Sequence, residues 1–228
     1  MAEVLRDDSD FIHNQPPSQR DTGAVDTAMG HSQGIVSAVV IAASGSFEEF
    51  TDNSYKAIRW LLYSSLRGQQ AFPVTSVEPS IVQDAIAGGE GTPSPMLSIA
   101  GLTLKGLQPH VSKTNRHHPA NSQLHILLHN GPKTFIITGP PKALFSLVTS
   151  LRKIRARSGL DQSKTPFSQR KPFFSIRFLH VGVPYHSEYL EGVTDTVEED
   201  LDEELWEVRD LKIPVYNTED GISFLFSI

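Results

Sequence analysis

The sequence predicts a mixed α/β protein in which a small ferredoxin-like unit is inserted into a larger α/β part. Two patterns lead to this prediction. A glycine-bounded turn is followed by Ile35–Ala43, whose small and branched apolar residues are typical of a buried helix. Farther along the chain, residues 95–157 carry the signals of strand, helix, hairpin and helix in that order.

The composition of the chain excludes several classes of protein. With 228 residues, of which 39% are hydrophobic, the chain can build one sizeable core and is too apolar for a disordered segment. The absence of cysteine excludes a disulfide framework, a thiolate zinc site and a cysteine nucleophile. The net charge of −6 argues against general nucleic-acid binding, which needs a basic surface.

The sequence contains neither a membrane span nor a secretory signal. Its longest nearly apolar run, Ile35–Ala43, is less than half of the about 20 residues that a spanning helix needs. The first 20 residues mix acidic and polar side chains without an apolar stretch. We therefore expect a soluble, cytoplasmic protein without a membrane partner.

We expect three parts along the chain: a flexible leader, a larger part that carries the functional residues, and a small inserted subdomain. They are residues 1–22, residues 23–94 together with 158–228, and residues 95–157, respectively. Within the larger part, Phe50–Arg67 predicts a second helix whose apolar positions share one stripe. The members of this stripe are Ala57, Ile58, Leu61, Leu62, Ser65 and Leu66. Strands are expected at Ala24–Met29, Phe173–Val183 and Ile213–Tyr216.

The small subdomain has local signals for each of its elements. Thr103 is a favourable N-cap for a helix at Thr103–Asn115. Asn130-Gly131, between two apolar runs, predicts the turn of a β-hairpin. The last helix, Pro140–Ala156, has proline near its start and basic residues at its end, which is the favoured polarity. The strands are expected at Met96–Ile99, Gln123–Leu128 and Thr134–Thr138.

The segment Gly30-His31-Ser32-Gln33-Gly34 matches G-x-S-x-G, the pattern of a nucleophile elbow between a strand and a helix. The glycines are needed because a Cβ at either flanking position would collide with the neighbouring strand or helix. Ser32 would lie at the helix N-terminus, where the N–H of Gln33 can donate to an oxyanion. The bare pattern also recurs by chance, and the small-residue helix behind it favours the functional interpretation.

A serine nucleophile needs a general base, and His186 is the best candidate among nine histidines. It lies just past an apolar predicted strand, and catalytic groups of open α/β sheets gather at such positions. The alternative for His186 is a solvated loop histidine. His125 and His129 share one strand face, but no carboxylate partners follow them, so we expect no metal site.

Five segments resemble the acyltransferase domain, the starter acetyl/acyl transferase, of the fungal type I fatty acid synthase β subunit. They are GHSQG with its apolar helix, PSPMLSI, LHNGPKTFIITGPP, SGLDQSKTPFSQRK and VPYHSEYL. The polyketide-pathway homologues of the hexanoate synthase type are as similar. The resemblance runs from about Gly30 to about Asp220, and it is specific because the five segments occur in the family's order. It implies an acyltransferase fold with an α/β-hydrolase-like larger subdomain.

The resemblance implies a ping-pong acyl transfer. Ser32 accepts the acyl group from acyl-CoA, and His186 is its general base in a dyad without an aspartate. The phosphopantetheine thiol of an acyl carrier protein domain then takes the acyl group. No cofactor is bound permanently, and the partners are the carrier domain and the remaining domains of a fatty acid synthase. Asn130 occupies the place of an asparagine at the rim of the active site, and equally fits the positive φ of the predicted turn.

The resemblance also concerns the acyl group. Family members that take malonyl have an arginine roughly 25 residues past the serine, which pairs with the free carboxylate. Lys56–Arg59 occupies that neighbourhood here, with Ala57 and Ile58 on the apolar stripe. We therefore expect an uncharged acyl group such as acetyl or hexanoyl, although a register slip of one would bring Arg59 nearer. The expected acyl pocket comprises His31, Ala57, Ile58 and Asn130.

Two charged segments have functional and structural interpretations. Leu151–Arg157 is strongly basic and suits the phosphates of CoA or an acidic carrier domain. A cationic helix C-terminus is the simpler explanation for it. Glu198–Glu207 is acidic and fits a solvated helix face.

The sequence departs from the family's pattern at both ends. Only 29 residues precede Gly30, without the Gln-Gly motif that supplies a second oxyanion donor, and the chain stops soon after residues 213–221. Loss of one such donor costs about 10²–10³ in rate. The chain is then a piece of a large synthase subunit, a non-catalytic remnant that binds partners, or a compact enzyme that completes its site with another chain. A serine thioesterase is the enzymatic alternative, but these enzymes have Ser, Asp or Glu, and His on one uninterrupted sheet.

Overall fold

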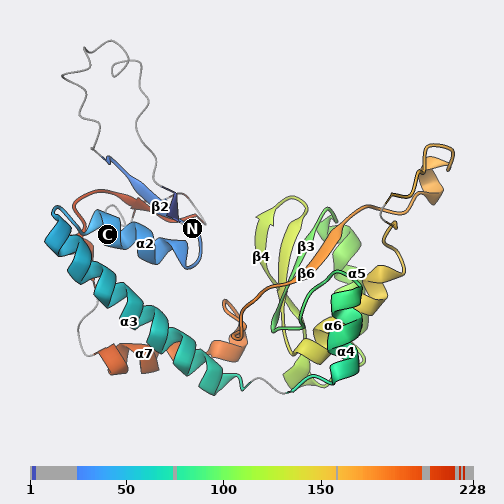
Figure 1. The fold of residues 1–228 in the computed structure, drawn as a ribbon, viewed down its shortest axis with the longest axis horizontal. Helices are drawn as coiled ribbons and strands as arrows, with labels where there is room; N and C mark the ends of the chain where they lie inside the picture. Colours follow the sequence, from blue (N-terminus) through green and yellow to red (C-terminus); the bar gives the residue numbers. More distant parts are fainter. Residues whose placement is uncertain are drawn as a thin grey trace, which may run out of the picture. The chain divides into compact units, whose positions relative to one another are not determined.

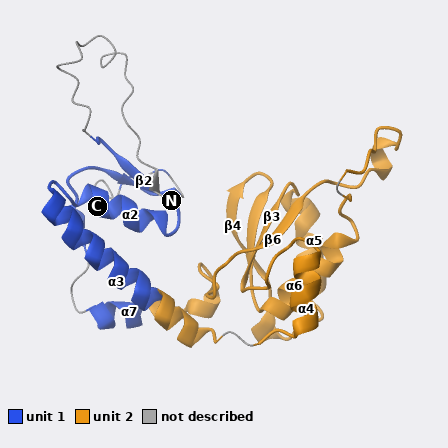
Figure 2. Cartoon of the chain, viewed as in Figure 1, with its two compact units in different colours: residues 1–64, 195–228 blue, residues 65–194 orange. Residues whose placement is uncertain are grey.

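The computed structural model of the chain describes residues 2–3, 25–73, 76–157, 159–201, 206–218, 221 and 223. The chain divides into two compact units (Figure 2). Unit 1 comprises Met1–Ser64 and Asp195–Ile228, and unit 2 comprises Ser65–Thr194. The predicted leader lies outside the described residues apart from Ala2 and Glu3. None of the described helices is both long enough and apolar enough to cross a membrane.

Unit 1 contains a small three-stranded sheet, with helix α2 (Gly34–Ala42) beside it in Figure 1. The central strand β2 (Ala28–Gly30) pairs antiparallel with β1 (Ala2–Glu3) and parallel with β7 (Val215–Tyr216). Small side chains let α2 pack closely against this sheet. The buried members of this layer are Ala28, Ala38, Ala42 and Val215. The predicted apolar helix is confirmed. The strands predicted at Ala24–Met29 and Ile213–Tyr216 are also confirmed, as β2 and β7, although both are shorter than expected.

Helix α3 (Phe47–Ala71) confirms the second predicted helix and extends beyond it at both ends. At its start, the hydroxyl of Ser46 accepts a hydrogen bond from the Glu49 amide at 3.1 Å. The helix begins in unit 1, and its residues from Ser65 onward belong to unit 2. In unit 1 the helix contacts Trp206, whose indole N–H donates to the side chain of Asn53 at 2.9 Å.

The predicted apolar stripe of α3 is buried only in part. Ala57 is 7% exposed and packs in one cluster with Val36 and Val40 of α2. Ile58 and Leu62 are 63% and 62% exposed. The periodicity therefore identifies apolar side chains on one side of the helix, of which Ala57 is buried and Ile58 and Leu62 are exposed.

Unit 2 is built on a four-stranded antiparallel sheet with the order β4-β5-β3-β6. Figure 1 shows helices α5 (Leu104–Asn115) and α6 (Pro141–Arg152) together on one face of this sheet. The strands are β3 (Met96–Ala100), β4 (His125–Gly131), β5 (Thr134–Thr138) and β6 (Ser175–Phe178). Strand, helix, hairpin and helix occur in the predicted order. Thr103 also caps α5 as predicted, with its hydroxyl accepting from the Gly106 amide at 3.3 Å.

The core of unit 2 lies between the sheet and the two helices. It contains alternate side chains of the strands and the inner side of each helix, which is the expected pattern for a helix layer on a sheet. Its fully buried large members include Leu97, Ile99, Leu107, Ile137, Leu144, Leu147 and Phe178. Helix α4 (Pro79–Ala87) adds Ala85 to the same cluster.

Two details of unit 2 differ from the sequence prediction. The hairpin turn is formed by Pro132 and Lys133, because strand β4 continues through Asn130 and Gly131 with an irregular register there. Asn130 has no positive φ, so its interpretation as a positive-φ turn residue is wrong. Strand β6 pairs with β3 and completes the order of a ferredoxin-like sheet from beyond residue 157.

Candidate active site

The nucleophile elbow expected around Ser32 has the backbone that the pattern requires. Strand β2 ends at Gly30 and α2 begins at Gly34, so the whole reversal takes three residues. Ser32 has a φ of 52°, a left-handed conformation that non-glycine residues adopt rarely. Residues held in this way cluster at functional sites when the surrounding structure fixes them.

Hydrogen bonds within the turn fix this conformation. The amides of Gly34, Ile35 and Val36 donate to the carbonyls three positions earlier, at 2.9, 3.0 and 3.2 Å. Ser32 therefore lies at the positive end of the α2 dipole, next to the amide of Gln33. The site offers a half-buried hydroxyl at a helix N-terminus, where a developing negative charge is stabilised.

A second loop meets this turn at the edge of the unit 1 sheet. Because β2 and β7 are parallel neighbours, the residues after each strand leave the sheet at the same edge. There, Nδ1 of His31 lies 3.0 Å from Oγ1 of Thr218. Thr218 is not among the residues that the sequence pattern predicts for the site. The polar residues directly after the predicted strand Ile213–Tyr216 were the signal that could have found it.

His186 also has a left-handed backbone, with a φ of 62°, in the loop after β6 in unit 2. Contacts on both sides of the histidine fix the loop. The hydroxyls of Tyr185 and Ser65 lie 2.9 Å apart, and the hydroxyl of Ser187 donates to the carbonyl of Pro184. Ser32 and His186 are the two non-glycine residues with positive φ in the described part of the chain.

The remaining residues of the expected pocket divide between the units. His31, Gln33, Ala57 and Ile58 belong to unit 1, and Asn130 belongs to unit 2. Ala57 is buried against α2, the helix that follows Ser32, whereas the side chain of Ile58 is largely exposed. Asn130 is exposed near the tip of the β4–β5 hairpin.

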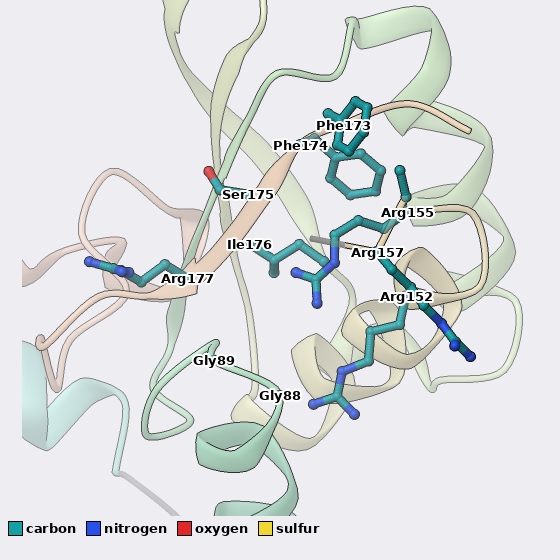
Figure 3. A pocket seen from close by; sticks show the side chains of 11 residues that line it. Gly88, Gly89, Arg152, Arg155, Arg157, Phe173, Phe174, Ser175, Ile176 and Arg177 are labelled. Atoms are coloured by element: carbon teal, nitrogen blue, oxygen red, sulfur yellow. The ribbon is translucent and has the colours of Figure 1, made fainter. Parts of the chain in front are cut away.

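The basic segment at the end of α6 holds a buried carboxylate. Glu90 is fully buried, and its oxygens accept from Arg152 at 2.7 and 3.2 Å and from Arg155 at 3.0 Å. Figure 3 shows Arg152 extending from α6 toward the loop at Gly88. A Cβ at Gly88 would lie 2.2 Å from the guanidinium of Arg152, so the glycine permits this approach. The hydrogen bonds to Glu90 above all raise the pKa of Arg152 above its usual value.

This arrangement favours a structural interpretation of the basic segment for Arg152 and Arg155. Arg152 also binds Asp84, at 2.6 Å, so every nitrogen of its guanidinium is used within the unit. Arg152 and Arg155 therefore have a structural role: their bonds to Glu90 tie the end of α6 to the loop after α4. Arg152, Arg155 and Gly88 line an open pocket of about 840 Å³, and the exposed Arg157 also lines it.

The sequence matches a known family over most of its length. Residues 9–172 match the family model described as SAT, starter unit:ACP transacylase in aflatoxin biosynthesis. Fatty acid synthase subunit beta of Saccharomyces cerevisiae is 47% identical over 196 residues, which are 85% of this chain and 10% of that protein. Fatty acid synthase beta subunit TOXC of Cochliobolus carbonum is 38% identical over 192 residues, 84% of this chain and 9% of that protein. The chain thus spans about a tenth of the length of these relatives.

Solved structures share the fold at low sequence identity. FabD from Acinetobacter baumannii matches with a TM-score of 0.54 and 18% identity, over 88% of this chain and 49% of that chain. The acyl-carrier-protein S-malonyltransferase from Burkholderia pseudomallei matches with a TM-score of 0.51 and 19% identity, over 90% and 52%. These matches confirm the predicted acyltransferase fold. Together with the family match over residues 9–172, they lead to one conclusion: the chain belongs to the starter unit:ACP transacylase family, which includes a segment of the fungal fatty acid synthase β subunits.

Proposed function

We propose that this chain transfers an acyl group from acyl-CoA to an acyl carrier domain, as the starter-loading part of a fatty acid synthase β subunit. The observation that carries the proposal is the backbone of Ser32. Its φ of 52° at a strand–helix turn, directly before the N-terminus of an apolar helix, is the geometry that a nucleophile elbow needs.

In the first half-reaction, Oγ of Ser32 attacks the thioester carbonyl while His186 takes the hydroxyl proton. The tetrahedral oxyanion accepts a hydrogen bond from the Gln33 amide and is stabilised by the α2 dipole. When the C–S bond breaks, His186 returns the proton to the leaving CoA thiolate, and the acyl group remains on Ser32 as an ester. The second half-reaction repeats these steps in reverse, with the phosphopantetheine thiol of the carrier domain as the nucleophile.

Two features of His186 support it as the proposed base. It follows the last strand of the unit 2 sheet, and its left-handed backbone is held by neighbouring hydroxyls. Holding a non-glycine residue in this conformation costs about 1–3 kcal/mol. Such strain persists only where the surrounding structure fixes it, and strained residues cluster at functional sites.

The acyl group is proposed to be uncharged. Ala57, in the neighbourhood where malonyl-specific members have arginine, is buried against α2 and offers no partner to a carboxylate. Lys56 lies instead beside Glu49 and Asp52, around a separate pocket of unit 1. An acetyl or short alkyl chain therefore suits the side chain of Ala57 better than malonyl, because Ala57 cannot pair with a carboxylate.

A non-catalytic interaction module of the same family is the second candidate. The exposed apolar side chains on α3 favour it, because a row of such side chains is typical of a surface that contacts another protein. This row comprises Tyr55, Ile58, Leu62 and Leu66, which are 67%, 63%, 62% and 44% exposed.

Intact-mass spectrometry of the chain after incubation with acetyl-CoA, hexanoyl-CoA or malonyl-CoA tests the proposal. We expect an adduct with the first two donors that is discharged by a carrier domain. Ser32→Ala should abolish the adduct, whereas the variant Ser37→Ala, at an exposed serine on the helix that follows Ser32, should retain it. Rapid release of free acid without a carrier would support a hydrolase instead. A folded chain without any adduct would support the interaction module, and preferential malonyl loading would overturn the uncharged acyl group.

A further inference from the structure

The pocket shown in Figure 3 lies at the outer edge of strand β6, within unit 2. β3 pairs with one edge of β6, and no described strand pairs with the other. On either side of the pocket the chain bonds with itself. The Phe178 amide donates to the carbonyl of Glu90 at 2.8 Å, and the Ala156 amide donates to the carbonyl of Pro172 at 2.9 Å. The pocket of about 840 Å³ opens between these two contacts.

The backbone amide of Ile176 points into this pocket. Successive amides of a strand point alternately to its two edges. The Leu179 amide donates inward to Met96, and the Phe178 amide donates outward to Glu90, so the amide of Ile176 also points outward. It has no acceptor at that edge within the described part of the chain, although Ile176 is only 3% exposed. Buried amides are almost always hydrogen-bonded, so this one indicates a bound acceptor.

Arginine side chains surround this amide. Arg155 uses one guanidinium nitrogen on Glu90 and no other on a described residue, and Figure 3 shows its side chain extending toward Ile176. Arg157 and Arg177 also line the pocket, are exposed, and have no hydrogen bond or ion pair with any described residue. Of the four arginines that line the pocket, two are paired with carboxylates of the chain, which are also two. The pocket therefore has a surplus of positive charge.

We propose that this pocket binds a phosphate-bearing small molecule, with a phosphate oxygen accepting from the Ile176 amide and the arginines pairing with the negative charge. The surplus suits the double charge of a phosphate group better than a single carboxylate, and arginine forks match phosphate oxygens in geometry. An extended peptide is a poor occupant, because the contacts at Glu90 and Pro172 would stop it at both ends of the pocket. The inference does not depend on Ser32 or His186.

The pocket is larger than a phosphate group, and its wall offers a place for a ring. Phe173 lines it and is 57% exposed, and Phe174 lines it beside Phe173. An exposed aromatic side chain is a surface on which a nucleobase can stack. We therefore expect a nucleoside phosphate to bind more tightly than inorganic phosphate. A free nucleotide and the nucleotide end of CoA share this chemistry.

Titration of the full 228-residue chain, labelled with ¹⁵N-isoleucine, with inorganic phosphate, ADP and CoA tests the proposal. The amide signal of Ile176, identified by its absence in Ile176→Val, should shift and saturate with ADP at a lower concentration than with phosphate. Saturation with CoA as well would assign the nucleotide end of CoA to the pocket. Saturation with ADP but not with CoA would assign a free nucleotide. Either result supports the site.

Variants at the pocket separate its contributions. Arg157→Gln and Arg177→Gln should each weaken ADP binding about 5- to 10-fold, the worth of a hydrogen bond to a charged group at an exposed position. Neither side chain bonds to a described residue, so both variants should fold. Phe173→Ala should weaken ADP binding by a similar factor and leave the binding of inorganic phosphate unchanged.

Arg116→Gln is the matched control. It removes the same charge from an exposed position of unit 2 outside the pocket, so it should leave the affinity for ADP unchanged. An equal loss in this control, a shift of Ile176 that sodium chloride of the same ionic strength reproduces, or no shift with any of the three probes would overturn the inference. Acyl loading at Ser32 is measured separately. A loaded chain without the shift keeps the proposed function and loses this site, and a chain that binds ADP without being loaded does the reverse.

Discussion

A Cβ atom at Gly30 would lie 2.1 Å from the carbonyl oxygen of Gly34, at the first turn of α2. Real Cβ contacts essentially never fall below 3.0 Å, and the opposing atoms here are backbone, which cannot turn aside like the end of a side chain. The close passage of strand and helix thus depends on the first glycine of the G-x-S-x-G motif. This close passage also keeps the turn tight around Ser32, which has the strained φ of 52°.

Gly30→Ala should therefore destabilise unit 1 and displace Ser32. We expect a loss of about 1–3 kcal/mol in the free energy of unfolding, the usual cost of overpacking, measured by urea denaturation. Gly131→Ala is the matched control, because its Cβ would meet Thr134 only at 4.0 Å. An alanine at position 30 that leaves both stability and acyl loading unchanged would contradict this account of the elbow.

Glu90→Gln should destabilise unit 2. The amide keeps the shape of the side chain but leaves Arg152 and Arg155 without the buried charge that they share, and these arginines are each 24% exposed. Because water reaches them in part, we expect about 2–3 kcal/mol rather than the larger cost of a wholly buried unpaired ion. Thermal unfolding measures the loss, and Glu78→Gln serves as the control because its pair with Lys142 is half exposed. Equal melting temperatures for the two variants would count against a structural part for the arginines.

Thr138→Val should stabilise the chain. The hydroxyl of Thr138 is fully buried and has no hydrogen-bond partner within the described part of the chain. Valine has the same shape, suits a β-strand and removes the unpaired polar atom, so we expect a gain of about 1 kcal/mol. Urea denaturation measures it, with Thr134→Val in the same strand as the comparison. A loss of stability on Thr138→Val would show that the hydroxyl does find a partner.

The sequence was sufficient for features that depend on neighbouring residues. The elbow and the cap at Thr103 were predicted because each is specified within a few positions. The turn of the hairpin was misplaced by two residues, since Asn130-Gly131 is a stronger local signal than Pro132-Lys133, and the register of β4 overrides it. Periodicity located the stripe of α3 without indicating what covers it, so the exposure of Ile58 was not foreseen.

Contacts between distant segments were not predictable from one sequence. Glu90 stands in a glycine-rich stretch that is typical of an exposed loop, and its burial depends on arginines 62 and 65 positions later. Thr218 meets His31 only because two strands from opposite ends of the chain pair in parallel. The pairing of β6 with β3 has the same origin. No local pattern specifies which strand lies beside which.

The stability of unit 2 should decrease in weak acid through His110. Burial first, and the positive charge of Lys113 second, lower the pKa of this histidine below its usual value. Its Nδ1 lies 3.0 Å from the hydroxyl of Ser150, which links α5 to α6. The unfolded chain therefore binds a proton at His110 more readily than the folded chain does. The resulting contribution to stability is present above the usual histidine pKa of about 6.5 and is lost as the pH falls through the lower folded value.

His110→Gln should weaken this pH dependence, because the variant has no proton to take up at that position. We expect the free energy of unfolding, measured in urea between about pH 7.5 and pH 5, to fall less steeply in His110→Gln than in the original chain. Lys113→Gln should act in the same direction but less strongly, since the lysine charge is the smaller of the two causes. If His110→Gln keeps the full acid dependence, other groups are responsible for it, and the burial of His110 beside α6 has no energetic consequence in this range.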